Sequence, residues 1–277
     1  MKTAVVIHIH KSKIDGDETI SLDRLRTTLP GYPVYLVAPP GLDTSQYRAV
    51  LRESYKDTVT FPPKFFTAVL AYNRLLLNSA FYERFLDYDY ILLHHIDAFL
   101  FGTDRDLEAW LRKGLDHIGP PMYEFDGTMN PKKFICSGNG GFNLRRVKTF
   151  YDISRSFRSV YTFGDVKRNF ALYNWKGRIS RLWYYFLMVS TLGSRVNLRF
   201  NRIKLNEDVI WGYHVPRHFP EFKNASFEEG YQFGMEFNCD ELMKLNKGQL
   251  PFGCHGWNRP MFRPFWKPYI EQFGYKL

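Results

Sequence analysis

Residues 90–101, YILLHHIDAFLF, have the composition of a buried strand but carry two histidines and an aspartate. An unpaired carboxylate is costly in such a place, because taking its charge out of water is unfavourable or shifts its pKa. On a strand, residues i and i+2 face the same side. His95 and Asp97 can therefore converge on one ligand, with His94 on the opposite face. The alternative is that Asp97 caps the next turn and the histidine is satisfied in the core.

The stretches around this strand alternate between strand and helix patterns. Apolar runs predict strands at residues 4–9 and 33–38, and DHIGPP predicts a further short strand. Apolar residues at helical spacing predict helices at residues 21–29, 65–85 and 104–113. Ser21 or Asp23 is expected to cap the first helix. This order favours an α/β fold whose mostly parallel sheet takes ligands beyond the carboxyl ends of its strands, where Asp97 falls.

The composition is that of a folded protein with a large core. The chain has 277 residues, of which 45% are hydrophobic and 18% aromatic, enough for one large domain or two small ones. Cys136, Cys239 and Cys254 lack metal-type spacing and favour a reduced, cytosolic protein. The N-terminus has no signal-peptide pattern, and no run reaches the roughly 18–20 apolar residues of a membrane span. We expect a soluble, cytoplasmic protein.

The net charge of +10 points to an anionic partner. Residues 155–202 contain ten Lys and Arg but one acid, Asp165, interleaved with aromatic residues. One interpretation is a buried helix with basic flanks. The other is a basic, aromatic surface that meets an anionic or lipid-linked partner, such as the inner face of a membrane.

Polar motifs recur later in the chain. GNGGFNLRR, residues 138–146, is a glycine turn that either allows close approach to a ligand or is an ordinary turn, and its Arg145 and Arg146 could neutralise phosphate. In NEDVIW, Asn206 is a candidate helix cap, and the two acids after it either belong to that cap or include a general base. In GCHGW, small neighbours suit His255 as a metal ligand or leave it as a packed core histidine.

In this order, the motifs HIDAFLF, GNGGFNLR, NEDVIW and PFGCHGW resemble those of GT-A-type glycosyltransferases. With the opening AVVIHIHK and YPVYLVAPPGLD, they look like a bacterial family long described as a domain of unknown function and assigned to that fold. The resemblance covers nearly the whole chain and is weakest over residues 155–202. It implies a single α/β, GT-A-like domain over residues 1–277, with a mixed, mostly parallel sheet. The nucleotide-binding half would reach about residue 125, and the acceptor-binding half would follow at 126–277.

The resemblance also implies the site. Such enzymes bind a divalent ion through a strand-end Asp-x-Asp, but here the first position is His95 and only Asp97 is a carboxylate. The resemblance implies Mn²⁺ or Mg²⁺ on Asp97 and His255, with His95 as a further candidate, and Asp208 or, as the alternative, Glu207 as catalytic base. The donor, a UDP-sugar, would contact ten residues: His8, His10, Lys11, His95, Asp97, Gly138, Asn139, Gly140, Gly141 and Trp257.

The implied reaction is metal-dependent transfer of a sugar from a nucleotide-diphosphate donor to a hydroxyl of a saccharide or lipid-linked acceptor. A carboxylate base fits inversion, and bacterial surface-polysaccharide synthesis is the expected setting. The alternatives are a non-catalytic nucleic-acid-binding protein, motivated by the charge, and a metal-dependent hydrolase or nucleotidyltransferase on a similar sheet. We disfavour nucleic acid as a partner, because acidic residues at strand ends oppose phosphate contacts.

Overall fold

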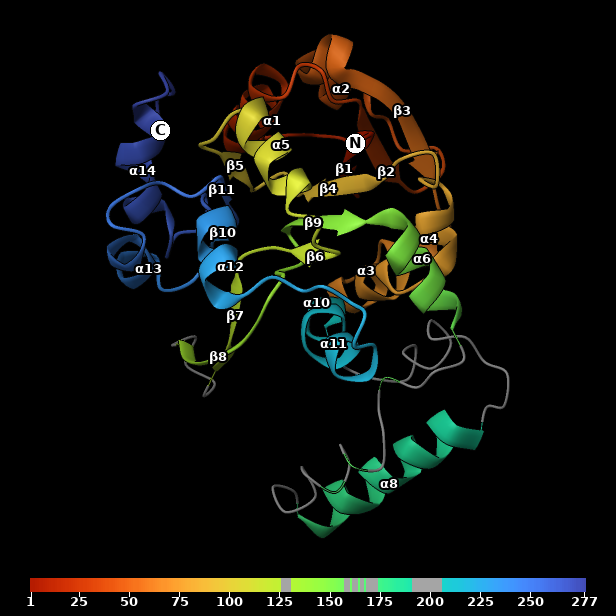
Figure 1. Cartoon of the computed structure of the whole chain (residues 1–277). Coiled ribbons are helices and arrows are strands. Elements are labelled where there is room, and N and C mark those ends of the chain that lie inside the picture. Colours follow the sequence, from red (N-terminus) through yellow and green to blue (C-terminus); the bar gives the residue numbers. More distant parts are fainter. Residues whose placement is uncertain (126–130, 157–159, 161–163, 165–166, 168–173, 191–205) are drawn as a thin grey trace.

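The computed structural model describes residues 1–125, 131–156, 160, 164, 167, 174–190 and 206–277. At its centre lies a six-stranded sheet of order β3-β2-β1-β4-β9-β6, with helices on both faces (Figure 1). The neighbours from β3 to β4 are parallel, whereas β9 runs antiparallel to β4 and β6. The sheet is therefore mixed and mostly parallel, as predicted. Its strands are β1 Thr3–His8, β2 Val34–Ala38, β3 Tyr55–Thr60, β4 Tyr90–His94, β6 His117–Ile118 and β9 Phe142–Arg146.

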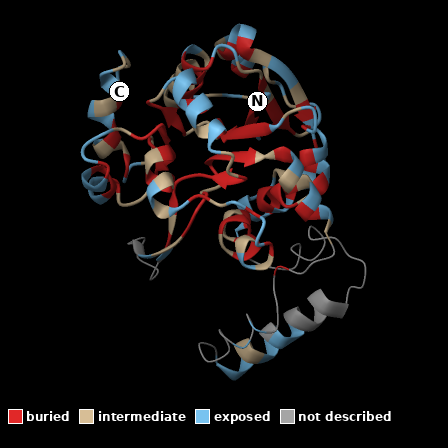
Figure 2. Cartoon of the chain, in the orientation of Figure 1, coloured by how far each residue is buried: buried red, intermediate tan, exposed pale blue. Residues whose placement is uncertain are grey.

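Alternation along the strands feeds two cores, one on each face of the sheet. In β1, Ala4 and Val6 pack into one core and Val5 and Ile7 into the other. Strand β4 is accordingly buried from end to end and β1, β2 and β9 nearly so, whereas the edge strand β3 is largely exposed (Figure 2). The first core is covered by α3 Val69–Leu76, α4 Ser79–Glu83 and α6 Val147–Arg155. The second is covered by α1 Gly16–Thr28, α2 Ser45–Leu51 and α5 Asp104–Arg112.

A smaller, three-stranded sheet of order β10-β11-β5 is formed mainly by the C-terminal part of the chain. It is connected directly to the large sheet, because β5 begins a few residues after β4, and a third hydrophobic core packs against it. Its elements are β5 Phe99–Leu100, β10 Gly234–Met235, β11 Gly253–Cys254, α12 Phe227–Phe233, α13 Cys239–Leu245 and α14 Arg263–Glu271. The remaining elements of the described residues are the 3-10 turns Arg52–Ser54 and Pro63–Phe65, the hairpin β7 Pro121–Phe125 and β8 Pro131–Ser137, α8 Trp175–Ser190, α10 Glu207–Val209, the π-helical turn Ile210–His214 and α11 Val215–His218.

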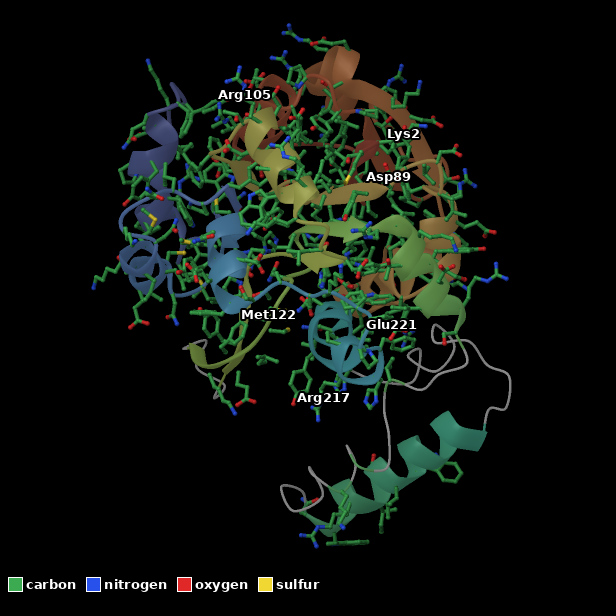
Figure 3. The ribbon with its side chains drawn as sticks, viewed as in Figure 1. Lys2, Asp89, Arg105, Met122, Arg217 and Glu221 are labelled. Carbon is green, nitrogen blue, oxygen red and sulfur yellow. The ribbon has the colours of Figure 1, made fainter. Side chains whose placement is uncertain are left out.

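The register between β1 and β4 is fixed at their start. Thr3 pairs with Tyr90, and the backbone N–H of Lys2 donates to the Asp89 carboxylate at 2.8 Å. Figure 3 shows these two labelled side chains near each other at the edge of the body. The carboxyl ends of β1 and β4 therefore lie together, and the residues after them share one edge of the sheet.

The structure corrects three sequence expectations about elements. Helix α1 begins at Gly16, because Asp15 and Glu18 form a capping box, and not at Ser21 or Asp23. The helix expected over residues 65–85 is divided into α3 and α4, because the Asn78 side chain accepts from the Ala80 N–H and starts a new helix. Strand β4 ends at His94.

Because β4 ends at His94, the residues that follow it are not part of the strand. His95 and Asp97 lie in a turn, in which the Ala98 N–H donates to the His95 carbonyl at 3.0 Å. They do not lie on a strand. The prediction that they share a face through strand alternation was therefore wrong in its reason, and their relative position follows from the turn.

The basic, aromatic segment is described only in part. Helix α8 lies outside the packed body in Figure 1, and its Trp175 and Trp183 side chains are 66% and 59% exposed. The buried-helix interpretation concerned residues 181–193; of their side chains only those of Leu182 and Trp183 are described, both are exposed, and for these two the interpretation was wrong. Arg195 and most of the rest of residues 155–202 lie outside the described residues. Within the described residues, no helix combines the length and the apolar character needed to cross a membrane.

Candidate active site

A cavity of about 720 Å³ opens beyond the carboxyl ends of β1 and β4. This is the edge where parallel sheets take their ligands. The polar residues of its lining come from both halves of the chain and include His95, Asp97, Asn139, Asp208, His255 and Arg259. The cavity thus gathers most of the motifs that the sequence singled out.

Two backbone pairings bring the motifs together. The His95 N–H donates to the Gly141 carbonyl at 2.9 Å, which places the glycine turn beside the end of β4. Cys254 pairs with Phe99 in the antiparallel contact of β11 and β5, so His255 lies next to the turn that carries Asp97.

These pairings assemble a cluster of metal-type ligands. His95, Asp97 and His255 each offer one ligand atom, and the three atoms lie within 4.8 Å of one another. One carboxylate and two imidazoles suit a divalent ion such as Mn²⁺, with open positions left for substrate oxygens. The residues present therefore fit the ion that the sequence analysis expected.

A fourth residue, Glu236, contacts the ring nitrogen of His255 that faces away from Asp97. Its Oε1 lies 3.2 Å from Nδ1 of His255, while Nε2 of the same ring lies 3.2 Å from Oδ1 of Asp97. Metal-binding histidines commonly contact a carboxylate through their second nitrogen, which orients the ring. Glu236 is 3% exposed and also accepts from the Asn139 side chain at 2.5 Å.

The charges of this cluster act strongly on one another. Burial alone lowers the pKa of His255, but Asp97 and Glu236 outweigh it and raise that pKa to about 10. Burial tends to raise the pKa of Asp97, but His255, His95 and Arg259 hold it well below its usual range. Asp97 is therefore ionised at neutral pH, as a metal ligand must be, whereas His255 is protonated in the metal-free site and would have to release its proton to bind an ion.

His95 has a different environment. Burial, followed by the charge of His255, lowers its pKa to about 3, so its ring is neutral at neutral pH. Its Nε2 lies 3.1 Å from the Tyr72 hydroxyl, which leaves Nδ1 for a ligand. His94 is fully buried against Phe142, away from the cavity lining.

The glycines of the turn make room for these side chains. A Cβ on Gly141 would overlap the His255 ring, and one on Gly140 would lie 2.7 Å from Oε1 of Glu207. Gly140 also donates its N–H to Oδ2 of Asp208 at 3.2 Å. Glycine is thus required at positions 140 and 141, because the Glu207 and His255 side chains approach the backbone closely there.

Asp208 has the properties of a proton acceptor. Burial and then the neighbouring Glu207 raise its pKa to about 7, and the backbone N–H groups of Val209 and Gly140 oppose the rise. A base with a pKa near the working pH is the most effective. Asn206 makes no side-chain cap and instead accepts from the Asn73 side chain at 3.1 Å, while Glu207 and Asp208 stand in the first turn of the helix that follows.

Glu207 is engaged internally. Its Oε1 accepts from the buried Arg145 guanidinium at 2.8 Å, and Arg145 also donates to the Tyr82 hydroxyl and the Asn143 side chain. Arg146 pairs with Asp116 at 2.9 Å. The suggestion that these two arginines neutralise phosphate was therefore wrong, since both are paired with carboxylates and neither arginine lines the cavity.

Three further expected contacts do not line the cavity. Trp257 is completely buried and donates from Nε1 to the Ser21 hydroxyl at 2.8 Å. Gly138 has φ 136° and packs against the His117 ring. Lys11 pairs with Glu18 at 2.6 Å.

The end of β1 does reach the cavity. His8 and His10 belong to its lining, and the His8 ring stacks on Phe66 with centroids 4.9 Å apart. The Tyr72 ring is tilted against the His8 ring, with the two ring centroids 4.0 Å apart. Burial, with His95 and His10, lowers the pKa of His8 to about 3. A neutral, aromatic wall results.

Sequence reasoning missed Glu236, Arg259 and Tyr72. Arg259 could have been found from its place four residues after His255, two residues beyond the motif PFGCHGW. Glu236 gave no local signal, because it reaches His255 through the parallel pairing of Met235 with Cys254.

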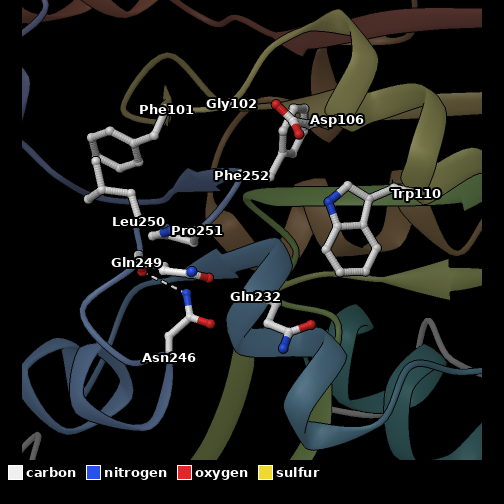
Figure 4. Close-up of a pocket in the computed structure, with 10 residues that line it drawn as sticks. All are labelled: Phe101, Gly102, Asp106, Trp110, Gln232, Asn246, Gln249, Leu250, Pro251 and Phe252. Atoms are coloured by element: carbon white, nitrogen blue, oxygen red, sulfur yellow. Dashed lines mark hydrogen bonds between the residues drawn. The ribbon is translucent and has the colours of Figure 1, made fainter.

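A second cavity, of about 370 Å³, lies between α5 and the segment that leads into β11 (Figure 4). Trp110 and Gln232 belong to its lining, and Asn246 donates to the Gln249 carbonyl at 2.6 Å. Its one carboxylate, Asp106, already serves the capping box of α5. This cavity contains none of the predicted site residues.

Known proteins resemble the chain in sequence and in fold. The profile of a family described as protein of unknown function DUF5672 matches residues 56–255. No curated protein matches the sequence. Among solved structures, a galactosyltransferase LgtC in complex with donor and acceptor sugar analogues has a TM-score of 0.55 at 12% identity, covering 97% of this chain and 94% of that one. Mouse xyloside xylosyltransferase 1 has a TM-score of 0.50 at 11% identity, covering 91% and 97%.

The glycosyltransferase GlyE of Streptococcus pneumoniae TIGR4 is a further match, with a TM-score of 0.47 and 15% identity, and covers 96% of this chain. This chain spans 59% of the length of GlyE. At such low sequence identity, the structural similarity to LgtC and to the xylosyltransferase establishes a common fold. The fold is that of GT-A glycosyltransferases such as LgtC, and the chain belongs to the family described as protein of unknown function DUF5672.

Proposed function

We propose that this protein is a glycosyltransferase that moves a sugar from a nucleotide-diphosphate donor, a UDP-sugar, to a hydroxyl of a saccharide acceptor. One observation carries the proposal: a single cavity at the ligand edge of the sheet holds both a metal-type cluster and, at Asp208, a carboxyl whose pKa is about 7. The shared fold with LgtC supports it.

In this proposal Asp97 and His255 hold Mn²⁺ or Mg²⁺, and His95 completes the set. The bound ion would supply positive charge for the diphosphate that leaves. Glu236 orients His255, and Gly141 lets its ring approach the turn. The stacked rings of His8 and Phe66 line the region proposed for the base and ribose.

Asp208 accepts the proton of the attacking hydroxyl in this scheme. The Gly140 N–H holds its Oδ2, and the adjacent Glu207 is fixed by Arg145, so the carboxyl has one position. A carboxylate base acting in one displacement fits inversion at the anomeric carbon. The anomeric coupling constant of the product, measured by NMR, tests this part.

A lipid-linked acceptor at the inner face of a membrane is part of the proposal. Trp175, Ile179, Leu182 and Trp183 follow the spacing of one helical face on α8, and all are at least 40% exposed. Lys176 and Arg178 lie among them, and the described helix has no acid in its sequence. Flotation with anionic vesicles tests it: binding lost in Lys176→Glu/Arg178→Glu supports the contact, and no binding by the unmodified protein refutes it.

The main test is a thermal-shift screen of nucleotide sugars with and without Mn²⁺. A donor at one hundred times its Kd should stabilise the protein by about 2.7 kcal/mol. The stabilising donor is then incubated with saccharide acceptors, and the products are identified by mass spectrometry. A new glycoside supports the proposal. Free sugar alone would indicate a hydrolase, and no response to any nucleotide sugar would reject the donor class.

A further inference from the structure

Arg259 bridges the two carboxylates of the metal-type cluster. Its Nη2 lies 3.1 Å from Oδ2 of Asp97, and its Nη1 lies 2.8 Å from Oε1 of Glu236. Arg259 lines the large cavity, and its side chain is 41% exposed. The guanidinium therefore lies between a candidate metal ligand and open space.

The same carboxylate cannot serve both cations equally well. A divalent ion on Asp97 repels a guanidinium at hydrogen-bond distance from the same group. Glu236 is buried and keeps its hold on Nη1, so the contact between Nη2 and Asp97 is the one that weakens. Occupation of Asp97 thus frees one edge of the Arg259 guanidinium within the cavity.

The backbone of Arg259 is fixed by hydrogen bonds, whereas its partly exposed guanidinium can move within the cavity. Its N–H donates to the Gly256 carbonyl at 3.0 Å, and its carbonyl accepts from Phe262 and Arg263 at the start of α14. Gly256 has φ 68°, and a Cβ there would lie 2.9 Å from Nε of Arg259. Gly256 therefore leaves space along the arginine stem.

We propose that Arg259 exchanges partners: it neutralises Asp97 in the metal-free protein and turns to the diphosphate of the donor once a divalent ion occupies Asp97. Guanidinium groups bind phosphate oxygens through paired N–H donors, which suits this second role. The inference rests on the proposed function, because the donor supplies the diphosphate. It makes metal binding a step that prepares the cavity for the nucleotide.

The test is Arg259→Gln, which removes the charge and keeps a hydrogen-bonding side chain. Mn²⁺ affinity is measured from the electron paramagnetic resonance signal of the free ion. The affinities for UDP, and for inorganic pyrophosphate as a probe without a base, are measured by calorimetry at saturating Mn²⁺. We expect Mn²⁺ to bind more tightly, on the order of tenfold, because its competitor on Asp97 is gone. We expect both diphosphates to bind about 10- to 100-fold more weakly, because a charged donor is lost.

Opposite changes in the two affinities separate this role from structural damage, which would weaken both. The matched control is Arg263→Gln: Arg263 follows in α14 but pairs with Asp17 and does not line the cavity, so both affinities should stay unchanged. Weaker Mn²⁺ binding in Arg259→Gln, or unchanged diphosphate binding, overturns the inference alone. If the unmodified protein binds Mn²⁺ but neither UDP nor pyrophosphate, the proposed function fails with it.

Discussion

Replacing Gly141 by alanine should disable the metal site through a single methyl group. The Cβ would lie 1.9 Å from Nε2 of His255, whereas ordinary contacts begin at 3.4 Å, so the ring must retreat by about 1.5 Å. The ring is held between Asp97 and Glu236, each at 3.2 Å. Because such a movement breaks one or both contacts, and a hydrogen bond to a charged group contributes about 1.5–3 kcal/mol, we expect a loss of about 2–6 kcal/mol of unfolding free energy.

Urea denaturation measures the loss in stability, and the resonance signal of free Mn²⁺ measures the loss of the site. Gly31→Ala is the matched control, because nothing lies within 4 Å of its added Cβ, and its effect should stay within about 0.5 kcal/mol. A Gly141→Ala protein with unchanged stability would refute the packing argument. Lower stability with unchanged Mn²⁺ affinity would show instead that His255 is not a ligand.

Three further changes probe the same cavity. Asp97→Asn should abolish Mn²⁺ binding and turnover while the circular dichroism spectrum stays native; full activity in EDTA would contradict the metal role. Asp208→Asn should lower kcat by about 10² and remove a rise in kcat/KM that otherwise levels off above pH 7, since the base works only when deprotonated. The raised pKa of Asp208 also makes stability fall as the pH rises from 3.8 through about 7, because the unfolded chain loses this proton at lower pH than the folded protein does. Urea midpoints measured against pH should therefore decrease less steeply in Asp208→Asn than in the unmodified protein. Arg145→Met should cost about 3–5 kcal/mol in urea denaturation by leaving Glu207 buried without its partner, and the added change Glu207→Gln should recover part of it; an additive double variant would argue against the pair.

The central sheet was predictable because its strands are apolar on both faces. Residues 4–9 and 33–38 are mostly apolar runs, of which all but His8, Pro33 and Tyr35 are buried, as in a sheet covered on both sides. Strand β3, YKDTVT, was not predicted, because an edge strand with exposed Lys56 and Asp57 has no such run. Local capping was also underestimated: Asp15 and Asn78 set helix boundaries that apolar spacing alone does not reveal.

The site was predictable where its residues stand in short motifs. Asp97 and His255 were identified from their neighbours, and the structure brings them together. Glu236 and Tyr72 were not, because their proximity depends on strand pairing and helix packing between distant segments. Trp257 shows the opposite error, since its motif is at the site while its side chain is directed into the core.

The antiparallel strand β9 also decides how the chain can be divided. It comes from the second half of the sequence but lies between β4 and β6, which come from the first. A fragment that stops near residue 125 would leave the edge of β4, YILLH, without its neighbour, and a bare apolar edge is a template for intermolecular pairing. The half proposed to bind the nucleotide is therefore not a portable module: cut out, it should aggregate, and chimaeras with related chains should carry residues 142–146 along with it.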